Sequence, residues 1–282
     1  MFNNNNRGFL EFILFPPTRV NENKLWRKLK DKTILITGAS FGIGESLAYK
    51  LAGTGVNLIL VARTEEKLIL VKNKIEQMGG HVKIFPTDLS KPDQVQLLLD
   101  SIQQLPNGID ILVNNAGKSI RRSIYNSLDR YHDFTRTMAI NYFGPVQLIL
   151  ALIPVLKKNK GHIINISAIN VLLAPVPYWA AYQSSKSAFD HWFRSVSPEL
   201  NAGGINTTSI YLPLVKTRMI VPTTVYQKMP TMTPKHVAKI ICRYILNKNR
   251  KFAPWWLVFG QLGSIIFRSP YEFLTAYFLK RK

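Results

Sequence analysis

Two side chains that could carry out acid–base chemistry, Tyr182 and Lys186, stand four residues apart on a stretch with helical hydrophobic spacing. Residues at this spacing face the same side of a helix, so the two side chains would project together. A phenol can protonate the oxyanion that forms when hydride adds to a carbonyl, and a neighbouring ammonium would lower the pKa of that phenol. The pair therefore suits carbonyl reduction or the reverse oxidation, although the same spacing also arises by chance.

A second candidate site is a glycine-rich turn that opens into a helix. It reads Thr37-Gly38-Ala39-Ser40-Phe41-Gly42-Ile43-Gly44 and follows the apolar run Thr33–Thr37. Glycines permit a tight turn and a close approach of the backbone to a ligand, and a helix N-terminus attracts phosphate. The spacing G-x-x-x-G-x-G differs from the ordinary dinucleotide fingerprint. Its place between a strand and a helix still predicts a dinucleotide site made by Gly38, Ser40, Phe41, Gly42, Ile43 and Gly44.

The choice between the two nicotinamide cofactors depends on Arg63, which follows the second apolar run, Asn57–Val61. An acidic side chain at this place would bind the ribose 2′-hydroxyl of NAD, whereas a guanidinium can bind a 2′-phosphate through two hydrogen bonds. The sequence therefore predicts NADP(H) as the cofactor. The alternative is an exposed arginine without a ligand.

Alternating strands and helices would bring these residues together. Strand-like runs are predicted at 33–37, 57–61, 82–85, 109–113, 162–166 and 206–212, and helices at 44–52, 65–78, 92–104, 128–157 and 181–200. This alternation indicates βαβ units and a parallel sheet that is covered on both faces. We therefore expect a single-domain α/β fold, a three-layer doubly wound Rossmann-like sheet, with ligands at the carboxyl ends of its strands.

The order of these motifs resembles the short-chain dehydrogenase/reductase family. The resemblance rests on the glycine turn, on Asn114-Asn115-Ala116-Gly117 after the fourth strand and on Tyr182-x-x-x-Lys186, and it runs from about residue 31 to residue 238. It implies that Tyr182 is the acid/base, that Lys186 binds the nicotinamide ribose and that Asn141 helps to hold a proton-relay water. It also implies cofactor contacts from Asp88, Leu89, Asn115, Ala116, Gly117, Tyr182, Lys186, Val215 and Thr217.

One position departs from the pattern of this family. Members usually carry a pair of serines just past the fifth strand, and the second serine binds the substrate oxygen. Here the pair is Ser167-Ala168, and the interval to Tyr182 is one residue longer than usual, which indicates an insertion within 171–178. Either Ser167 takes over the catalytic role or the donor is absent, in which case activity would be weak.

Clues to the substrate come from the loop 216–232, which is apolar and contains no acid, and from the basic residues Lys118, Arg121 and Arg122 near the cofactor edge. An apolar, adaptable loop suits a hydrophobic substrate. The stretches 116–123, 136–144 and 210–223 resemble the bacterial long-chain fatty acyl-CoA reductase branch, which implies reduction of an acyl thioester to an aldehyde with NADPH. The alternatives are a ketone or secondary alcohol dehydrogenase of the same family and a catalytically weakened NADP-binding protein.

The overall composition excludes several classes of protein. The chain has 282 residues, 46% of them hydrophobic, and 37 Lys and Arg against 16 Asp and Glu give a net charge of +21. This balance excludes a disordered or collagen-like chain. The lone Cys242 excludes an internal disulfide and a cysteine-based zinc site, and the five histidines lack the spacing of metal ligands, so no metal is predicted. Because no DNA- or RNA-binding motif directs the positive charge, no nucleic-acid partner is predicted.

The chain divides into an N-terminal apolar and basic extension (1–30), an NADP-binding domain that includes the substrate loop (31–250) and a C-terminal segment (251–282). Residues 252–267 carry no charge but have basic flanks, and they are fewer than the ~20 that a membrane-spanning helix needs. Such a segment suits the interface of an anionic membrane, or else a helix packed on the core or on a second subunit. We predict a cytoplasmic protein with peripheral contact to the inner face of the membrane, and the family resemblance implies a homodimer or homotetramer.

Overall fold

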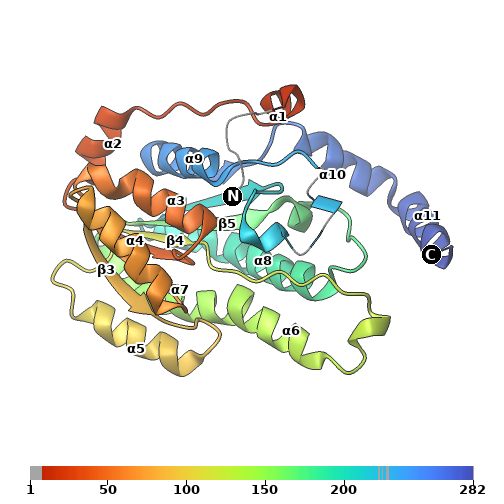
Figure 1. Cartoon of the computed structure of the whole chain (residues 1–282), viewed down its shortest axis with the longest axis horizontal. Coiled ribbons are helices and arrows are strands. Elements are labelled where there is room, and N and C mark those ends of the chain that lie inside the picture. The colour runs from red at the N-terminus through yellow and green to blue at the C-terminus, as the bar shows by residue number, and fades with distance from the viewer. Residues whose placement is uncertain (1–7, 222, 224, 227–228, 282) are drawn as a thin grey trace.

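A parallel sheet forms the middle layer of the molecule (Figure 1). The computed structural model describes residues 8–221, 223, 225–226 and 229–281. In this part of the chain seven strands lie in the order β3-β2-β1-β4-β5-β6-β7, and all neighbouring strands are parallel. The strands are β1 (Thr33–Thr37), β2 (Asn57–Ala62), β3 (His81–Pro86), β4 (Ile111–Asn114), β5 (His162–Ala168), β6 (Asn206–Leu212) and β7 (Lys251–Phe252). The doubly wound, Rossmann-like fold predicted from the sequence is thereby confirmed.

Helices cover both faces of the sheet. Successive side chains of a strand point to opposite faces, and here the side chains on both faces are apolar. Ile34 and Ile36 of β1 face one hydrophobic core, and Leu35 faces the other. The first core includes residues of α2 (Glu22–Leu29), α3 (Gly42–Leu51), α4 (Glu65–Gln77) and α9 (Pro234–Asn247). The second core includes residues of α5 (Pro92–Gln103), α7 (Gly144–Lys158) and α8 (Ala180–Ala202). Two apolar faces explain why the strands read as continuous hydrophobic runs.

The second helix, α2, joins the N-terminal extension to the domain. Leu25 and Leu29 are 0% and 1% exposed and belong to the first core. The Asn21 side chain caps the helix by accepting a hydrogen bond from the backbone N–H of Lys24 at 2.9 Å, and Lys28 Nζ donates to the carbonyl of Leu246 in α9 at 2.7 Å. Although the sequence of this region is polar and basic, the buried leucines make α2 part of the folded domain.

The long helix predicted at 128–157 is present as one continuous helix over 131–158, and it contains a π-helical turn that was not predicted. The chain forms α6 (Tyr131–Met138), a π-helical turn η3 (Ala139–Phe143) and then α7. At Gly144 a Cβ atom would lie 1.9 Å from the carbonyl oxygen of Leu89, so only glycine lets the helix pass this close. By length and composition, 131–158 could cross a membrane, but its apolar residues pack into the second core at Leu148, Ile149, Leu152 and Leu156.

Three further helices lie outside the layered core. They are α1 (Phe9–Leu14), α10 (Leu257–Ile266) and α11 (Arg268–Lys280). No residue of α1 or α11 is buried, and Leu257 is the buried residue of α10. Figure 1 shows α11 projecting from the body of the molecule with the C-terminus at its end. The segment before α10 forms the short β7, which pairs with Ser209 and Ile210 of β6 and was not predicted from the sequence.

The single cysteine, Cys242, lies in α9 and is completely buried. Burial raises the pKa of its thiol to about 12, because the thiolate would lose its hydration in the apolar first core. The thiol is therefore protonated at neutral pH.

Candidate functional site

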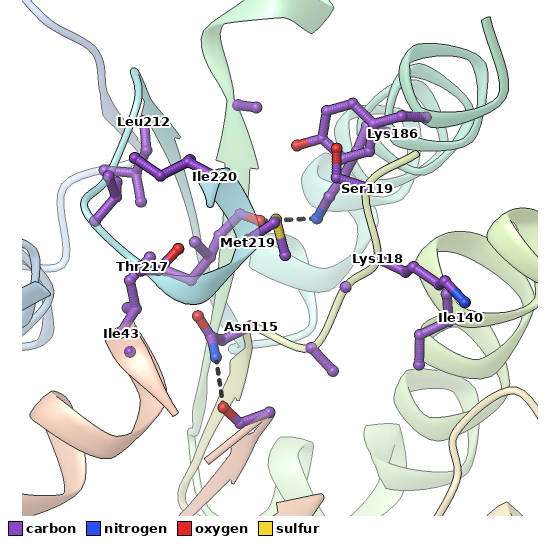
Figure 2. A pocket seen from close by; sticks show the side chains of 18 of the residues that line it. Ile43, Asn115, Lys118, Ser119, Ile140, Lys186, Leu212, Thr217, Met219 and Ile220 are labelled. Carbon is purple, nitrogen blue, oxygen red and sulfur yellow. Dashed lines mark hydrogen bonds between the residues drawn. The ribbon is translucent and has the colours of Figure 1, made fainter. Parts of the chain in front are cut away.

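The main cavity, about 880 Å³ in volume, lies at the carboxyl ends of the parallel strands. Its lining includes residues that follow β1, β2, β4, β5 and β6, which is where ligands bind in sheets of this topology. Figure 2 shows side chains from these strand ends together with Lys186 of α8 around one space. The structure thus gathers residues from Gly38 to Met229 into one site.

The glycine turn forms one edge of this cavity. Gly38 has a φ of +65°, and a Cβ atom there would lie 2.9 Å from the Cα of Ala116. At Gly44, a Cβ atom would lie 2.4 Å from the carbonyl oxygen of Gly38, so glycine lets α3 begin directly against the turn. Gly44 packs against the turn at Gly38 and Ala39 and does not line the cavity. The other predicted residues of the turn do line it: Gly38, Ser40, Phe41, Gly42 and Ile43.

The segment after β4 is fastened to the glycine turn. Asn115 Nδ2 donates to the carbonyl oxygens of Thr37 and Gly38 at 2.9 and 3.2 Å, and its side chain is directed towards the turn in Figure 2. The hydroxyl of Thr37 accepts from the backbone N–H groups of Asn115 and Ala116, both at 2.9 Å. The Asn115 amide therefore holds two cavity walls at a fixed spacing, while Ala116 and Gly117 complete the lining.

Cations dominate the charged part of the lining. Among the described residues that line the cavity, Asp88 is the one acid, against the five cations Arg63, Lys118, Arg136, Lys186 and Arg218. Burial alone would raise the pKa of Asp88, but hydrogen bonds from Ser90 and the charges of Arg63 and Lys91 lower it, so Asp88 is ionised. The pKa of Lys118 is lowered by burial and then by the charges of Arg136 and Arg63. This charge balance suits a polyanionic ligand.

The predicted cofactor residues fit NADP(H) as a group. Leu89, Val215 and Thr217 line the same cavity as the glycine turn, Arg63 and Asp88. A glycine cradle that no Cβ could fill accommodates a pyrophosphate, and a guanidinium at the end of β2 suits a 2′-phosphate. The described residues contain no cluster of histidine, cysteine and acidic side chains that could hold a metal ion.

The predicted catalytic residues Tyr182 and Lys186 lie on α8, one helical turn apart, and both line the cavity. Lys186 Nζ donates to the carbonyl of Ile166 in β5 at 3.2 Å (Figure 2). Burial raises the pKa of Tyr182 to about 12, with a small contribution from Tyr226, and burial lowers the pKa of Lys186 to about 8 against the opposing charge of Asp190. Burial thus shifts the pKa of Tyr182 in the direction opposite to the effect expected from Lys186.

Asn141 lies in the π-helical turn and does not itself line the cavity. Its Nδ2 donates to the carbonyl of Lys118 and to Ser185 Oγ, both at 2.9 Å, and its Oδ1 accepts from the backbone N–H of Lys118 at 2.9 Å. The side chain thus ties the loop after β4 to α8. Asn141 therefore fixes the distance between the cofactor wall and the helix that carries Tyr182.

The two residues at the end of β5 differ in what they offer to a substrate. Ser167 and Ala168 both line the cavity. The hydroxyl of Ser167 donates to Asp190 Oδ1 at 3.4 Å, and Ala168 has no polar side chain. Nearby in the lining, the side-chain Oδ1 of Asn170 is buried without a hydrogen-bond partner in the described part of the chain. Asn170 is thus a polar group of the cavity that the sequence motifs did not indicate.

The rest of the cavity wall is apolar. The loop 216–232 is closed at its base by hydrogen bonds from Lys216 N to Met232 O and from Met232 N to Leu214 O, both at 2.8 Å. Residues 222, 224, 227 and 228 lie outside the described residues. The loop contributes Met219, Ile220, Tyr226 and Met229 to the lining.

An aromatic pair covers the catalytic tyrosine. Trp179 stacks on Tyr226 with 5.7 Å between the ring centroids and makes an edge contact with Tyr182 at 5.9 Å. Leu173 and Val176, from the segment that contains the predicted insertion, extend this apolar wall. Sequence reasoning missed Trp179, Leu173 and Val176, because their segment has neither a motif nor a regular periodicity.

Comparison with known proteins shows the family of this chain. A family model described as short chain dehydrogenase matches residues 32–227. A fatty acyl-CoA reductase from Acinetobacter baylyi is 45% identical over 240 residues, which are 85% of this chain and 80% of the relative. A fatty acyl-CoA reductase from Mycobacterium tuberculosis is 37% identical over 80% of this chain and 77% of its own length.

A solved structure provides the same fold with a nucleotide bound. A metagenomic short-chain oxidoreductase in complex with NADP superposes with a TM-score of 0.69 at 26% identity, covering 80% of this chain and 96% of that one. The glycine turn, the Asn114-Asn115-Ala116-Gly117 segment and the helix with Tyr182 and Lys186 follow one another in the order that the family resemblance requires. The chain belongs to the short-chain dehydrogenase family of oxidoreductases.

Proposed function

We propose that this protein is an NADPH-dependent reductase that converts a long-chain acyl-CoA to the aldehyde. The observation that carries the proposal is one cavity with an apolar wall beside Tyr182 and a surplus of cations in the rest of its lining. An acyl-CoA combines a hydrophobic chain with a polyanionic head, and each half matches one part of that lining. The two relatives named fatty acyl-CoA reductase support the same substrate class.

The cofactor site is assigned to the glycine turn, the strand ends and α8. We propose that Arg63 binds the 2′-phosphate, that Asp88 and Leu89 flank the adenine, and that Lys186 holds the nicotinamide ribose. Val215 and Thr217 would fix the carboxamide. When bound, NADPH supplies hydride to the carbonyl carbon of the substrate.

Tyr182 then transfers the proton that the reduction needs. As the carbonyl becomes an alkoxide, the Tyr182 hydroxyl donates its proton to that oxygen, which gives a hemithioacetal. The carbon–sulfur bond of this adduct breaks, its hydroxyl proton returns to Tyr182, and the sulfur leaves as the CoA thiol after taking a proton from water. One acyl-CoA, one NADPH and one proton thus yield one aldehyde, one CoA and one NADP⁺. A pKa of about 12 keeps Tyr182 protonated at neutral pH, which suits an acid in the reductive direction.

The proposal is tested with purified protein, NADPH and a long-chain acyl-CoA, following NADPH oxidation and free thiol release together. We expect the two signals to rise in a one-to-one ratio. The Tyr182→Phe variant, which keeps the ring and removes the acid, should lose turnover by about 10²–10⁴-fold and still bind NADPH. NADPH oxidation on ketones or aldehydes without thiol release would instead identify a general ketone or alcohol dehydrogenase of the same family.

Ala168 favours a second candidate, a catalytically weakened NADP(H)-binding protein. Loss of a preorganised hydrogen-bond donor costs on the order of 10²–10³ in rate in comparable sites. If this candidate is correct, Ala168→Ser will raise turnover by about that factor. Unchanged turnover would show that another group, such as Asn170, already holds the substrate oxygen.

We also propose that the protein is cytoplasmic, touches the membrane peripherally and forms a homodimer or homotetramer. Membership of the short-chain dehydrogenase family supports the assembly through α8 and the helix that precedes it, α7. Light scattering of the purified protein measures the assembly directly.

A further inference from the structure

Three helices from the two ends of the chain carry an unusual number of exposed apolar side chains. We call α1, α10 and α11 the terminal apolar face. Phe9 of α1, Ile265 of α10 and Phe273 of α11 are 81%, 75% and 72% exposed. Further exposed members are Leu10, Phe12, Ile13, Val258, Phe259, Leu262, Ile266, Leu274, Tyr277, Phe278 and Leu279. A large exposed apolar surface on a folded chain usually marks a site where another protein or a membrane binds.

The two ends of the chain meet in this face. Figure 1 shows α1 beside the beginning of α10, and Trp255 Nε1 donates to the carbonyl oxygen of Ile13 at 3.1 Å. In the sequence these are two apolar segments, one in the N-terminal extension and one in the C-terminal segment. The structure joins them, so the apolar area of α1 adds to that of α10 and α11.

The terminal apolar face is attached to the wall of the catalytic cavity. Ser264 of α10 accepts a hydrogen bond from the backbone N–H of Ala174 at 3.0 Å, and the Tyr271 hydroxyl of α11 donates to the carbonyl of Pro175 at 3.0 Å. A Cβ atom on Gly260 would lie 3.1 Å from Leu173, so α10 lies directly on that side chain. Leu173 and Val176 line the cavity on either side of these contacts.

The other wall of the cavity is held by the same face. Glu11 of α1 accepts a hydrogen bond from the backbone N–H of Thr231 at 2.9 Å, near the end of the loop 216–232. Met229, two residues earlier, lines the cavity. The face is therefore connected both to the segment 173–176 and to the substrate loop, and these two segments form the apolar part of the site.

The positive charges of this face favour a negatively charged partner. Basic residues of this face lie in α11 and directly after it, namely Arg268, Lys280 and Arg281, and the acid in α11, Glu272, is paired with Arg268 at 3.0 Å. A second copy of the chain would bring a surface of the same positive sign against this one, which is unfavourable. Anionic lipid headgroups attract lysine and arginine, and aromatic and aliphatic side chains insert at their boundary with the acyl chains.

We propose that α1, α10 and α11 dock on an anionic lipid bilayer and thereby hold the apolar end of the cavity at the bilayer surface. On the reductase function proposed above, a long-chain acyl-CoA residing in the bilayer would enter the site between the segment 173–176 and the loop 216–232. The substrate would not have to cross water with its chain exposed.

The test uses the full chain and vesicles of phosphatidylcholine alone or mixed equally with phosphatidylglycerol. We expect the protein to co-sediment with the mixed vesicles and much less with the neutral ones. The double variant Ile265→Glu/Phe273→Glu should bind at least about ten-fold more weakly, because it adds two acids to the apolar face. The matched control Leu70→Glu/Leu97→Glu makes the same change at two exposed leucines of α4 and α5 and should bind like the natural chain.

Activity provides the second readout. Mixed vesicles should raise kcat/KM for a long-chain acyl-CoA in the natural chain and not in the Ile265→Glu/Phe273→Glu variant, while a short-chain acyl-CoA should be turned over equally by both. Equal vesicle binding by the variant and the natural chain overturns the proposal. So does a natural chain that ignores vesicles but loses a dimer on the same substitutions, since a second copy then covers the face. If vesicles bind as expected but no acyl-CoA is reduced, the reductase function fails and the docking face stands.

Discussion

At the scale of single residues, the proposed chemistry uses the protonated forms of Tyr182 and Lys186. Burial moves the two pKa values in opposite directions, to about 12 for Tyr182 and to about 8 for Lys186. The tyrosine is thus protonated at neutral pH, and the lysine loses its charge above about pH 8.

A pH profile follows from these values. Lys186 is charged below about pH 8 and neutral above it, so kcat for reduction should be constant below that value and fall above it. The Lys186→Arg variant should lack the falling limb up to at least pH 10, whatever its absolute rate, because a guanidinium keeps its charge to above pH ~12. Initial rates at saturating NADPH measure this. A falling limb that persists in the arginine variant would assign it to another group.

A substitution at Arg63 tests the proposal that its guanidinium binds the 2′-phosphate of NADPH. Removal of its guanidinium in Arg63→Ala should raise KM for NADPH by about 10–100-fold, as expected for a charged hydrogen bond of about 1.5–3 kcal/mol. KM for NADH should change little, because NADH lacks the 2′-phosphate. Arg243→Ala, which removes an exposed arginine from α9, is the matched control. Equal losses for both nucleotides would place Arg63 away from the 2′-phosphate.

At the scale of elements, α2 shows that the N-terminal region contributes to stability. Leu25→Ala should lower the free energy of unfolding by about 2–5 kcal/mol, because it leaves a cavity in the first core. Lys24→Ala, on the exposed side of the same helix, should change it by less than about 0.5 kcal/mol. Denaturant unfolding of both variants measures the difference. Equal stabilities would mean that α2 does not pack as described.

Elements with a local sequence signal could be predicted, and elements without one could not. The six predicted strands and the glycine turn have local signals, namely apolar runs and punctuating glycines, and they appear in the structure within a few residues of their expected bounds. The π-helical turn at Asn141 has no such signal, since it depends on Gly144 passing the carbonyl of Leu89 and on bonds to Lys118 and Ser185.

The candidate site was predictable to the same extent. Residues that belong to motifs, such as Asn115 and Lys186, could be found because each follows a recognisable strand or lies at a helical spacing. The apolar loop 216–232 was also recognisable, but the part of the wall made by Leu173 and Trp179 was not, because these residues contact α10 and Tyr226, far away in the sequence.

At the scale of the whole molecule, the net charge of +21 adds to the cations of the cavity. The affinity for a polyanionic substrate should therefore depend on salt, because the Debye length falls from ~10 Å at 0.1 M to ~3 Å at 1 M. We expect KM for a long-chain acyl-CoA to rise several-fold over that range. An acyl-pantetheine with the same chain, which lacks the phosphates, should show a much smaller rise. Parallel behaviour of the two thioesters would mean that the CoA phosphates do not contact the basic lining.

Cys242 has a consequence for the kind of intermediate that can form. A thioester is an acyl donor to any reactive thiolate, and many enzymes use a cysteine to take the acyl group from CoA before reducing it. Here the one cysteine of the chain is buried in α9 and stays protonated below about pH 12. On the reductase function proposed above, Cys242 would therefore not take up the acyl group, and hydride would reach the thioester while it is still joined to CoA. A released CoA would likewise find no accessible thiol on Cys242 with which to form a mixed disulfide, so oxidising conditions would not block the protein in this way.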